Sequence, residues 1–206
     1  MTGYILYGYP QSGSAAIEVA LAVGGIPHEV RDLDPEAGDL AGPDFLALNP
    51  RGQVPVLVLP DGSVVTEIPA ILLHLADAHP ESGLAPAPGS AARAQHDRWL
   101  AFAHANLYEG VLRSFYADRY TTDPHGADGV RAAAQAYVRR HLALLEMAMV
   151  GEPFLLGPRL MGVDCLIWVI LSWLGPEDKA DALRLSALAD AVATDPHAKT
   201  VAARHS

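Results

Sequence analysis

The sequence has a single cysteine, Cys165, among its 206 residues. One cysteine cannot form an intramolecular disulfide, and no group of His and Cys residues has the spacing of metal ligands. We therefore expect a protein of a reducing compartment, without a disulfide, a structural zinc or another metal cofactor. Cys165 lies in an apolar segment that continues to residue 174, and we interpret it as a buried core residue.

Positive charge is also scarce, since 14 Lys and Arg stand against 24 Asp and Glu and the net charge is −10. This balance disfavours nucleic acid and anionic membranes as partners. No apolar run reaches the roughly 20 residues of a membrane span, and the first residues carry no basic flank or small-residue cleavage site. Together these features predict a cytoplasmic protein with no membrane and no nucleic-acid partner.

Apolar residues, in contrast, make up 50% of the chain. This share is enough to bury a core in one large domain or in two small ones. Up to His79 the sequence alternates between strand-like and helix-like segments. Strands are predicted at 4–7, 28–33, 54–59 and 64–65, and helices at 14–23, near Phe45 and at 71–79. The alternation predicts an α/β fold for residues 1–79.

Helix-breaking residues gather in segment 80–90, which contains three prolines and two glycines. This composition is typical of a linker between domains. After it, every periodic segment is helical, and helices are predicted at 91–116, 129–150, 163–174 and 183–193. The sequence therefore predicts two domains, an α/β domain at 1–79 and an all-α domain, a helical bundle, at 91–206.

Two prolines and a glycine surround Val54 in segment 49–55, directly before a predicted strand. An X-Pro bond isomerises at a cost of only about 0.5–1 kcal/mol, so Pro55 is a candidate cis proline. A cis bond there would leave the amide and carbonyl of Val54 free to pair with an extended peptide ligand, as in strand addition. The alternative is an ordinary loop proline without a ligand role.

Two further segments place polar groups at predicted helix starts. The hydroxyls of Ser12 and Ser14 precede the first helix, whose free N–H groups and dipole stabilise an anion. In the simpler interpretation Ser14 is an N-cap and Ser12 a turn residue. Glu67 follows the hairpin, where Thr66 can cap the next helix, and the alternative for Glu67 is a favourable charge at a helix start.

These three segments, in this order and followed by a helical half, resemble the cytosolic glutathione S-transferase family over nearly the full length of the chain. The resemblance is to bacterial members with a serine in the first loop. It implies a thioredoxin-like domain and a helical bundle, in a cytoplasmic homodimer that acts in detoxification. It also implies glutathione as co-substrate, a small electrophilic or apolar molecule as second partner, and no metal or organic cofactor.

The resemblance also implies which residues bind glutathione. Val54, next to the cis Pro55, would pair its backbone with the cysteinyl part, while Gln53 and Glu67 would hold the γ-glutamyl part. The family usually has Ser after the acidic residue, but this chain has Ile68, which offers only its backbone amide. A hydrogen bond to a charged group is worth about 1.5–3 kcal/mol, so its loss would weaken affinity roughly ten- to a hundredfold.

For the glutathione thiol, the resemblance places the activating hydroxyl in the first loop. Ser12 is the first candidate, Ser14 the second, and Tyr9 the tyrosine-type alternative. Tyr7 is also a candidate, although core packing is its simpler interpretation. Gly13 stands where the cysteine-type members carry their nucleophile, so we expect no thiol–disulfide chemistry from the protein itself.

In the family, the first long helix of the second domain lines the co-substrate pocket. The residues predicted for this pocket are Tyr108, Asn106, Arg113 and Tyr116. Tyr108 falls where bacterial relatives carry a histidine and is expected to stack on the electrophile or to donate to it. Arg113 is a candidate partner for an acidic co-substrate or for a carboxylate at the domain interface.

Four residues outside these segments are expected to affect stability or to lie on the surface, without a role in the site. Met161 replaces the Ser or Thr that caps the core helix in the family, which should cost about 1 kcal/mol unless Asp164 finds another backbone donor. His125 and His141 have no carboxylate partner at a useful spacing and are expected on the exposed surface.

The leading hypothesis is a glutathione transferase that activates the glutathione thiol for attack on an electrophilic carbon. The alternatives within enzymes are other reactions of the same thiolate, namely isomerisation, peroxide reduction and dehalogenation. The alternative from another class is a non-catalytic binding protein of the same fold, which the departures at Ile68 and Met161 favour.

Overall fold

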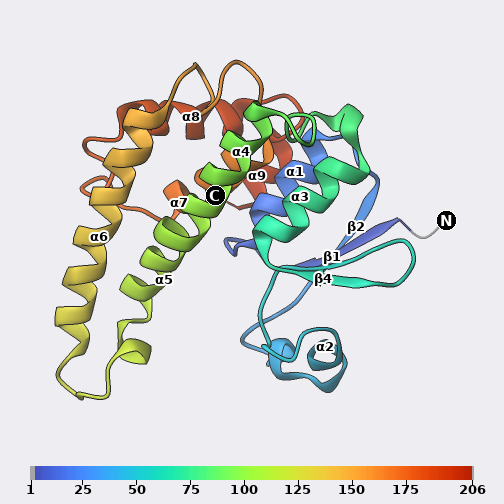
Figure 1. Cartoon of the computed structure of the whole chain (residues 1–206). Coiled ribbons are helices and arrows are strands. Elements are labelled where there is room, and N and C mark those ends of the chain that lie inside the picture. Colours follow the sequence, from blue (N-terminus) through green and yellow to red (C-terminus); the bar gives the residue numbers. More distant parts are fainter. Residues whose placement is uncertain (1–2, 206) are drawn as a thin grey trace.

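The computed structural model describes residues 3–205 and shows a four-stranded sheet beside a group of helices (Figure 1). The strands are β1 Tyr4–Gly8, β2 His28–Asp32, β3 Val56–Val58 and β4 Val64–Thr66, in the order β2-β1-β3-β4. β1 pairs in parallel with β2 and antiparallel with β3, so that Leu6 lies opposite both Val30 and Leu57. The predicted hairpin is present, but β3 is shorter than segment 54–59 because Pro55 has no amide hydrogen to give to the sheet.

Outside the sheet the described chain consists of helices and the loops that connect them. They are α1 Ser14–Val23, α2 Pro43–Leu48, α3 Ile68–Ala78, α4 Ala91–Phe102, α5 Glu109–Phe115, α6 Ala127–Ala148, α7 Gly162–Ser172, α8 Leu183–Thr194 and α9 Lys199–Arg204. A π-helical segment, Ala103–Tyr108, joins α4 to α5, and 3-10 turns lie at Asp39–Ala41, Pro80–Ser82 and Ala117–Tyr120. The sequence pattern did not predict α9, which is too short to show a helical period.

Helix α1 lies at the centre of the molecule. It is buried from Ser14 to Leu21 because it packs against β1, α3, α7 and α9. Figure 1 shows α1 and α3 on one side of the sheet and α2 beyond the other. This arrangement confirms the predicted fold class, a thioredoxin-like α/β domain followed by a helical domain. It also fixes the start of α1 against the helical half of the chain.

The buried helix α7 holds the two halves together. Cys165 within it is fully buried, as expected, and burial raises the pKa of its thiol. The carboxylate of Asp164 accepts hydrogen bonds from the amides of Leu155 and Met161, at 2.9 and 2.8 Å. Asp164 therefore takes two backbone donors at the start of α7, which offsets the absence of a Ser or Thr at position 161.

The predicted linker, residues 80–90, packs against the helical half rather than standing apart from it. Leu84 is buried, and its carbonyl accepts a hydrogen bond of 2.8 Å from the amide of Gly162 at the start of α7. Ser90 accepts from the amide of Arg93 and caps α4, so the predicted helix start at Ala91 is confirmed. The division into domains at 1–79 and 91–206 stays a prediction.

The expectation that His141 is exposed is wrong. His141 is only 9% exposed, its Nδ1 lies 2.7 Å from the carbonyl of Tyr137, and its ring stacks on the Tyr137 ring. It belongs to the apolar stripe of α6 because it follows the buried Ala134 and Val138 at helical spacing. His125 is exposed, as predicted. Among residues 3–205, none of the helices combines the length and apolar character needed to cross a membrane.

Candidate functional site

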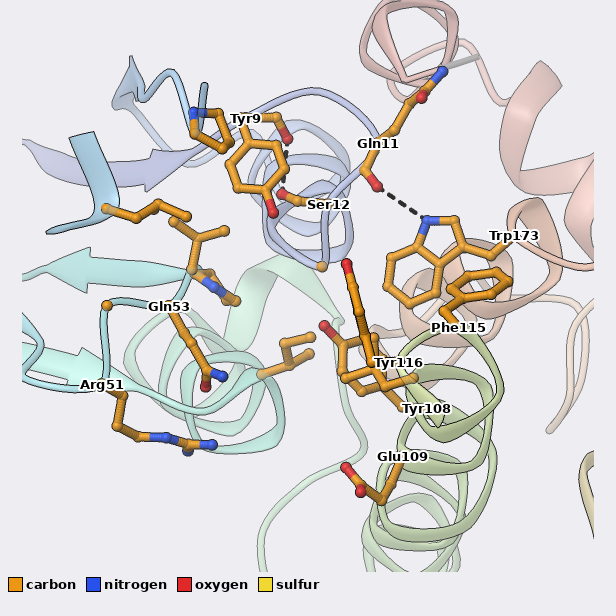
Figure 2. A pocket seen from close by; sticks show the side chains of 18 of the residues that line it. Tyr9, Gln11, Ser12, Arg51, Gln53, Tyr108, Glu109, Phe115, Tyr116 and Trp173 are labelled. Carbon is orange, nitrogen blue, oxygen red and sulfur yellow. Dashed lines mark hydrogen bonds between the residues drawn. The ribbon is translucent and has the colours of Figure 1, made fainter. Parts of the chain in front are cut away.

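A cavity of about 1040 Å³ lies between the sheet domain and the helical half. Its walls come from the loop after β1, the segment before β3, the start of α3 and the helix that leads into α5 (Figure 2). All three segments that the sequence singled out therefore meet at one cavity. Of the residues predicted for the site, those that line it are Tyr9, Ser12, Gln53, Val54, Pro55, Glu67, Ile68, Tyr108 and Tyr116.

The loop after β1 brings hydroxyl groups to the cavity. The Ser12 hydroxyl donates to the carbonyl of Tyr9 at 2.7 Å and lies 2.7 Å from the Ser14 hydroxyl. Ser14 is the first residue of α1, only 1% exposed, and is not part of the cavity wall. The Tyr9 side chain lines the cavity, and its pKa is raised, mainly by burial and further by Tyr116. The Tyr7 hydroxyl instead accepts a hydrogen bond from Arg31.

Residues from the C-terminal part of the chain fix the same loop. The backbone amide of Gln11 donates to Nδ1 of His205 at 3.1 Å. The backbone carbonyl of Gln11 accepts from Nε1 of Trp173 at 3.1 Å (Figure 2). Gln11 has a φ of 61°, which is uncommon for a residue other than glycine. Trp173 and His205 also line the cavity, and the sequence offered no signal for either role.

The segment before β3 has the geometry that the sequence predicted. The Val54–Pro55 bond is cis. The buried Asn49 side chain closes the turn, since its Nδ2 donates to the Gln53 carbonyl at 2.7 Å and its Oδ1 accepts from the Arg51 amide at 3.1 Å. Within residues 3–205, the amide and carbonyl of Val54 form no hydrogen bond. They are therefore available to a ligand in the cavity.

An ion pair marks the start of α3. Glu67 has a φ of 68°, and its carboxylate accepts a hydrogen bond of 2.8 Å from Nη1 of Arg51. The two side chains are 50% and 62% exposed, so the pair faces the cavity and its solvent. Ile68 contributes to the cavity wall but is only 2% exposed, because its side chain packs in the hydrophobic core. At this end of the cavity a cation and an anion stand side by side, and the sequence had identified only Glu67.

The opposite wall is aromatic. The Tyr108 ring stacks on His104 and packs against Trp173, each with ring centres 5.2 Å apart. Burial raises the pKa of the Tyr108 phenol strongly and lowers the pKa of His104, so both groups are held neutral. Tyr108 is the last residue of the π-helical segment and Tyr116 follows the end of α5. Figure 2 shows both side chains extending toward the loop of Tyr9 and Ser12.

Two residues predicted for this wall do not line the cavity. Asn106 turns toward α6, where its Oδ1 accepts a short hydrogen bond from the Tyr137 hydroxyl. Arg113 lies beside the rings of Tyr120 and Tyr137, with its guanidinium carbon 5.5 and 5.9 Å from the ring centres. Asn106 and Arg113 do not reach the cavity because of their positions around the helix. Tyr108 and Tyr116 are eight residues apart and lie on the same helix face, whereas Asn106 and Arg113 lie on other faces.

Within the described residues, no three His, Cys, Asp or Glu side chains gather as a metal site. The cavity instead offers a pair of opposite charges, an unpaired strand-like backbone segment, several hydroxyls and an aromatic wall. This set can bind an extended zwitterionic peptide along one wall and an apolar molecule along the other.

Comparisons with known proteins agree with this geometry. Residues 14–78 match the family model "Glutathione S-transferase, N-terminal domain". The chain is 31% identical over 204 residues to the uncharacterized GST-like protein YncG of Escherichia coli K12, covering 97% of each chain. It is 30% identical to the glutathione S-transferase GST-4.5 of Xanthomonas campestris, covering 82% of this chain and 81% of that protein.

One similar solved structure contains bound glutathione. A sphingomonad glutathione S-transferase in complex with glutathione superposes on this chain with a TM-score of 0.82 and 32% identity, over 98% of each chain. Both the sequence and the fold are thus shared over nearly the full length. The chain belongs to the glutathione S-transferase family.

Proposed function

We propose that this protein is a glutathione transferase, which binds glutathione in the cavity and favours its thiolate for attack on an electrophilic small molecule. The observation that carries the proposal is the meeting of the Val54 backbone, the Arg51–Glu67 pair and the first-loop hydroxyls at one cavity. The sphingomonad relative that binds glutathione shares this fold at 32% identity, which supports the same ligand here.

The chemistry of each wall suggests how glutathione would lie. The cysteinyl part would add to the free backbone of Val54 as an extra strand. Glu67 would accept from the γ-glutamyl ammonium, Gln53 would bind the same part, and Arg51 would face its carboxylate together with the Ile68 amide at the start of α3. This placement directs the sulfur to the start of α1.

Ser12 is the first-loop hydroxyl that the geometry favours for the thiol. Ser12 lines the cavity, whereas Ser14 is buried behind it. On binding, the Ser12 hydrogen would turn from the Tyr9 carbonyl to the sulfur, and Ser14 would still hold the Ser12 oxygen. Lowering a thiol pKa by two units takes about 2.7 kcal/mol of thiolate-favouring interaction, which one hydroxyl and a helix start can supply.

The proposed reaction needs no further reagent. The thiol proton passes to solvent, the sulfur lone pair forms the new carbon–sulfur bond, and the electrophile releases its leaving group or accepts the electron pair. Orientation and electrostatic stabilisation by the cavity supply the acceleration. Isomerisation, peroxide reduction and dehalogenation start from the same thiolate, and a panel of electrophiles would separate these alternatives.

We also propose the homodimeric state and the cytoplasmic location expected of the family.

The test is a titration of the purified protein with glutathione, recording the ultraviolet absorbance of the thiolate near neutral pH. S-methylglutathione is the matched control, because it fills the same site and cannot ionise. A saturable thiolate signal with glutathione alone supports the proposal. Binding of S-methylglutathione without a thiolate signal from glutathione would favour the non-catalytic alternative, and binding of neither would exclude a glutathione site.

A further inference from the structure

Gly13, beside the start of α1, lies against two other residues of the cavity wall, Ile68 and Tyr108. The resemblance to the family implies that other members carry the nucleophilic cysteine, a serine and a histidine at these three positions. A Cβ atom added at Gly13 would collide with the Tyr108 hydroxyl oxygen and would lie 3.0 Å from Cδ1 of Ile68. The absence of a side chain at position 13 is therefore what allows the Tyr108 hydroxyl to reach the start of α1.

The Tyr108 ring is held firmly by two neighbouring aromatic side chains. His104 stacks on the ring with an angle of 16° between the planes, and Trp173 packs on it at 58°. In the described part of the chain, no group forms a hydrogen bond with the Tyr108 hydroxyl, which faces the cavity. Because burial raises the pKa of this phenol, it keeps its hydrogen at neutral pH. An oriented, protonated hydroxyl thus stands at the start of α1.

The hydroxyl groups of the first-loop serines, unlike that of Tyr108, already take part in hydrogen bonds. The single hydrogen of Ser12 is directed to the Tyr9 carbonyl, at 2.7 Å. Ser14 has contacts with Ser12 and with the same carbonyl. Either serine must give up a hydrogen bond before it can donate to a ligand, whereas Tyr108 gives up none.

We propose that the Tyr108 hydroxyl, seated against Gly13, donates a hydrogen bond to the glutathione sulfur and is a catalytic residue from the helical half of the chain. The inference rests on the proposed function and deepens it, because it adds a second thiolate donor to Ser12. The phenol keeps its proton throughout. The thiol proton leaves to solvent, and the thiolate accepts the Tyr108 hydrogen bond until the carbon–sulfur bond forms.

The decisive variant is Tyr108→Phe, which keeps the stacked ring and removes only the hydroxyl. We expect an unchanged affinity for S-methylglutathione, a rise of about one unit or more in the pKa of bound glutathione, and at least a tenfold loss of kcat/KM near neutral pH. The thiol pKa is measured from thiolate absorbance against pH. Tyr137→Phe is the matched control for this readout, because it also removes a single phenol hydroxyl and Tyr137 does not line the cavity.

Gly13→Ala gives an independent test, since its methyl group would displace the Tyr108 hydroxyl. We expect Gly13→Ala to raise the thiol pKa in the wild-type background and to raise it much less in the Tyr108→Phe background. An unchanged thiol pKa in Tyr108→Phe overturns the inference, as does a change confined to the KM of the electrophile. If the wild-type protein gives no thiolate signal, the proposed function fails, and that result is separate from a signal that Tyr108→Phe leaves intact.

Discussion

The Gln11 amide donates a hydrogen bond of 3.1 Å to Nδ1 of His205, which lies 194 residues later in the sequence. His205 is 5% exposed, and its Nε2 lies 2.9 Å from the buried carboxylate of Glu18 in α1. Since Nδ1 accepts from the backbone, Nε2 carries the hydrogen and donates it to Glu18. Figure 1 shows α9 beside α1, so the last helix holds the loop that bears Ser12.

This relationship predicts that His205 positions the loop. His205→Ala should lower kcat/KM roughly tenfold or more, because small displacements of catalytic groups are costly. His197→Ala is the matched control, since His197 is exposed and lies on the same C-terminal segment. The measurement is kcat/KM together with the Kd of S-methylglutathione. Equal kcat/KM in the two variants would show that the loop keeps its place without His205.

A second prediction concerns Glu67. Glu67→Gln should weaken the binding of S-methylglutathione about tenfold, because the charge that accepts from the ammonium is lost. Its free energy of unfolding should change by less than about 1 kcal/mol, since the ion pair with Arg51 is largely exposed. Calorimetric titration and denaturant unfolding measure the two effects, with the exposed Glu81→Gln as control. An unchanged Kd in Glu67→Gln would remove Glu67 from the site.

The sequence predicted those parts of the site that depend on local chemistry. The cis Pro55, the hairpin and the hydroxyl-bearing loop before α1 each follow from a few adjacent residues. Glu67 could be placed at a helix start for the same reason, because turn and capping residues act over short distances. The apolar periods likewise predicted most of the helices.

The sequence could not predict contacts that depend on how distant elements pack. The Arg51–Glu67 pair forms only when the segment before β3 faces the start of α3, and the contact of His205 with Gln11 requires α9, a helix too short to be recognised. The direction of Asn106 depends on helical phase across a π-helical segment, which no composition signal marks. These features come from tertiary structure.

A third prediction concerns stability. Asp164→Asn should lower the free energy of unfolding by about 1–3 kcal/mol, because an amide can accept from only one of the Leu155 and Met161 backbone donors with its oxygen. Denaturant unfolding near pH 5, below the raised pKa of Asp164, measures the loss. Asp181→Asn is the matched control, because Asp181 is exposed and its carboxylate has no hydrogen bond or ion pair with the described residues.

The same carboxyl predicts a pH dependence of stability. Burial raises the pKa of Asp164 from 3.8 to about 7 in the folded protein. Between these values the folded state holds a proton that the unfolded chain has released, so the contribution of this group to stability is complete below about pH 4 and is lost as the pH rises through about 7. The difference in unfolding free energy between wild type and Asp164→Asn should therefore decline over this interval. A difference that is constant or rises with pH would contradict the raised pKa.

The last prediction separates the two loop serines. Ser12→Ala should lower kcat at least tenfold with little loss of glutathione binding, which is the result expected when an interaction specific to the transition state is removed. Ser14→Ala should have a smaller effect on kcat, because Ser14 lies behind the cavity wall and acts through Ser12. Both variants are compared at saturating glutathione, with S-methylglutathione binding as the check on the site. If Ser12→Ala turns over like wild type while Ser14→Ala does not, the order of the two serines is reversed. If neither changes turnover, Tyr9 and Tyr108 remain as the hydroxyls that act on the sulfur.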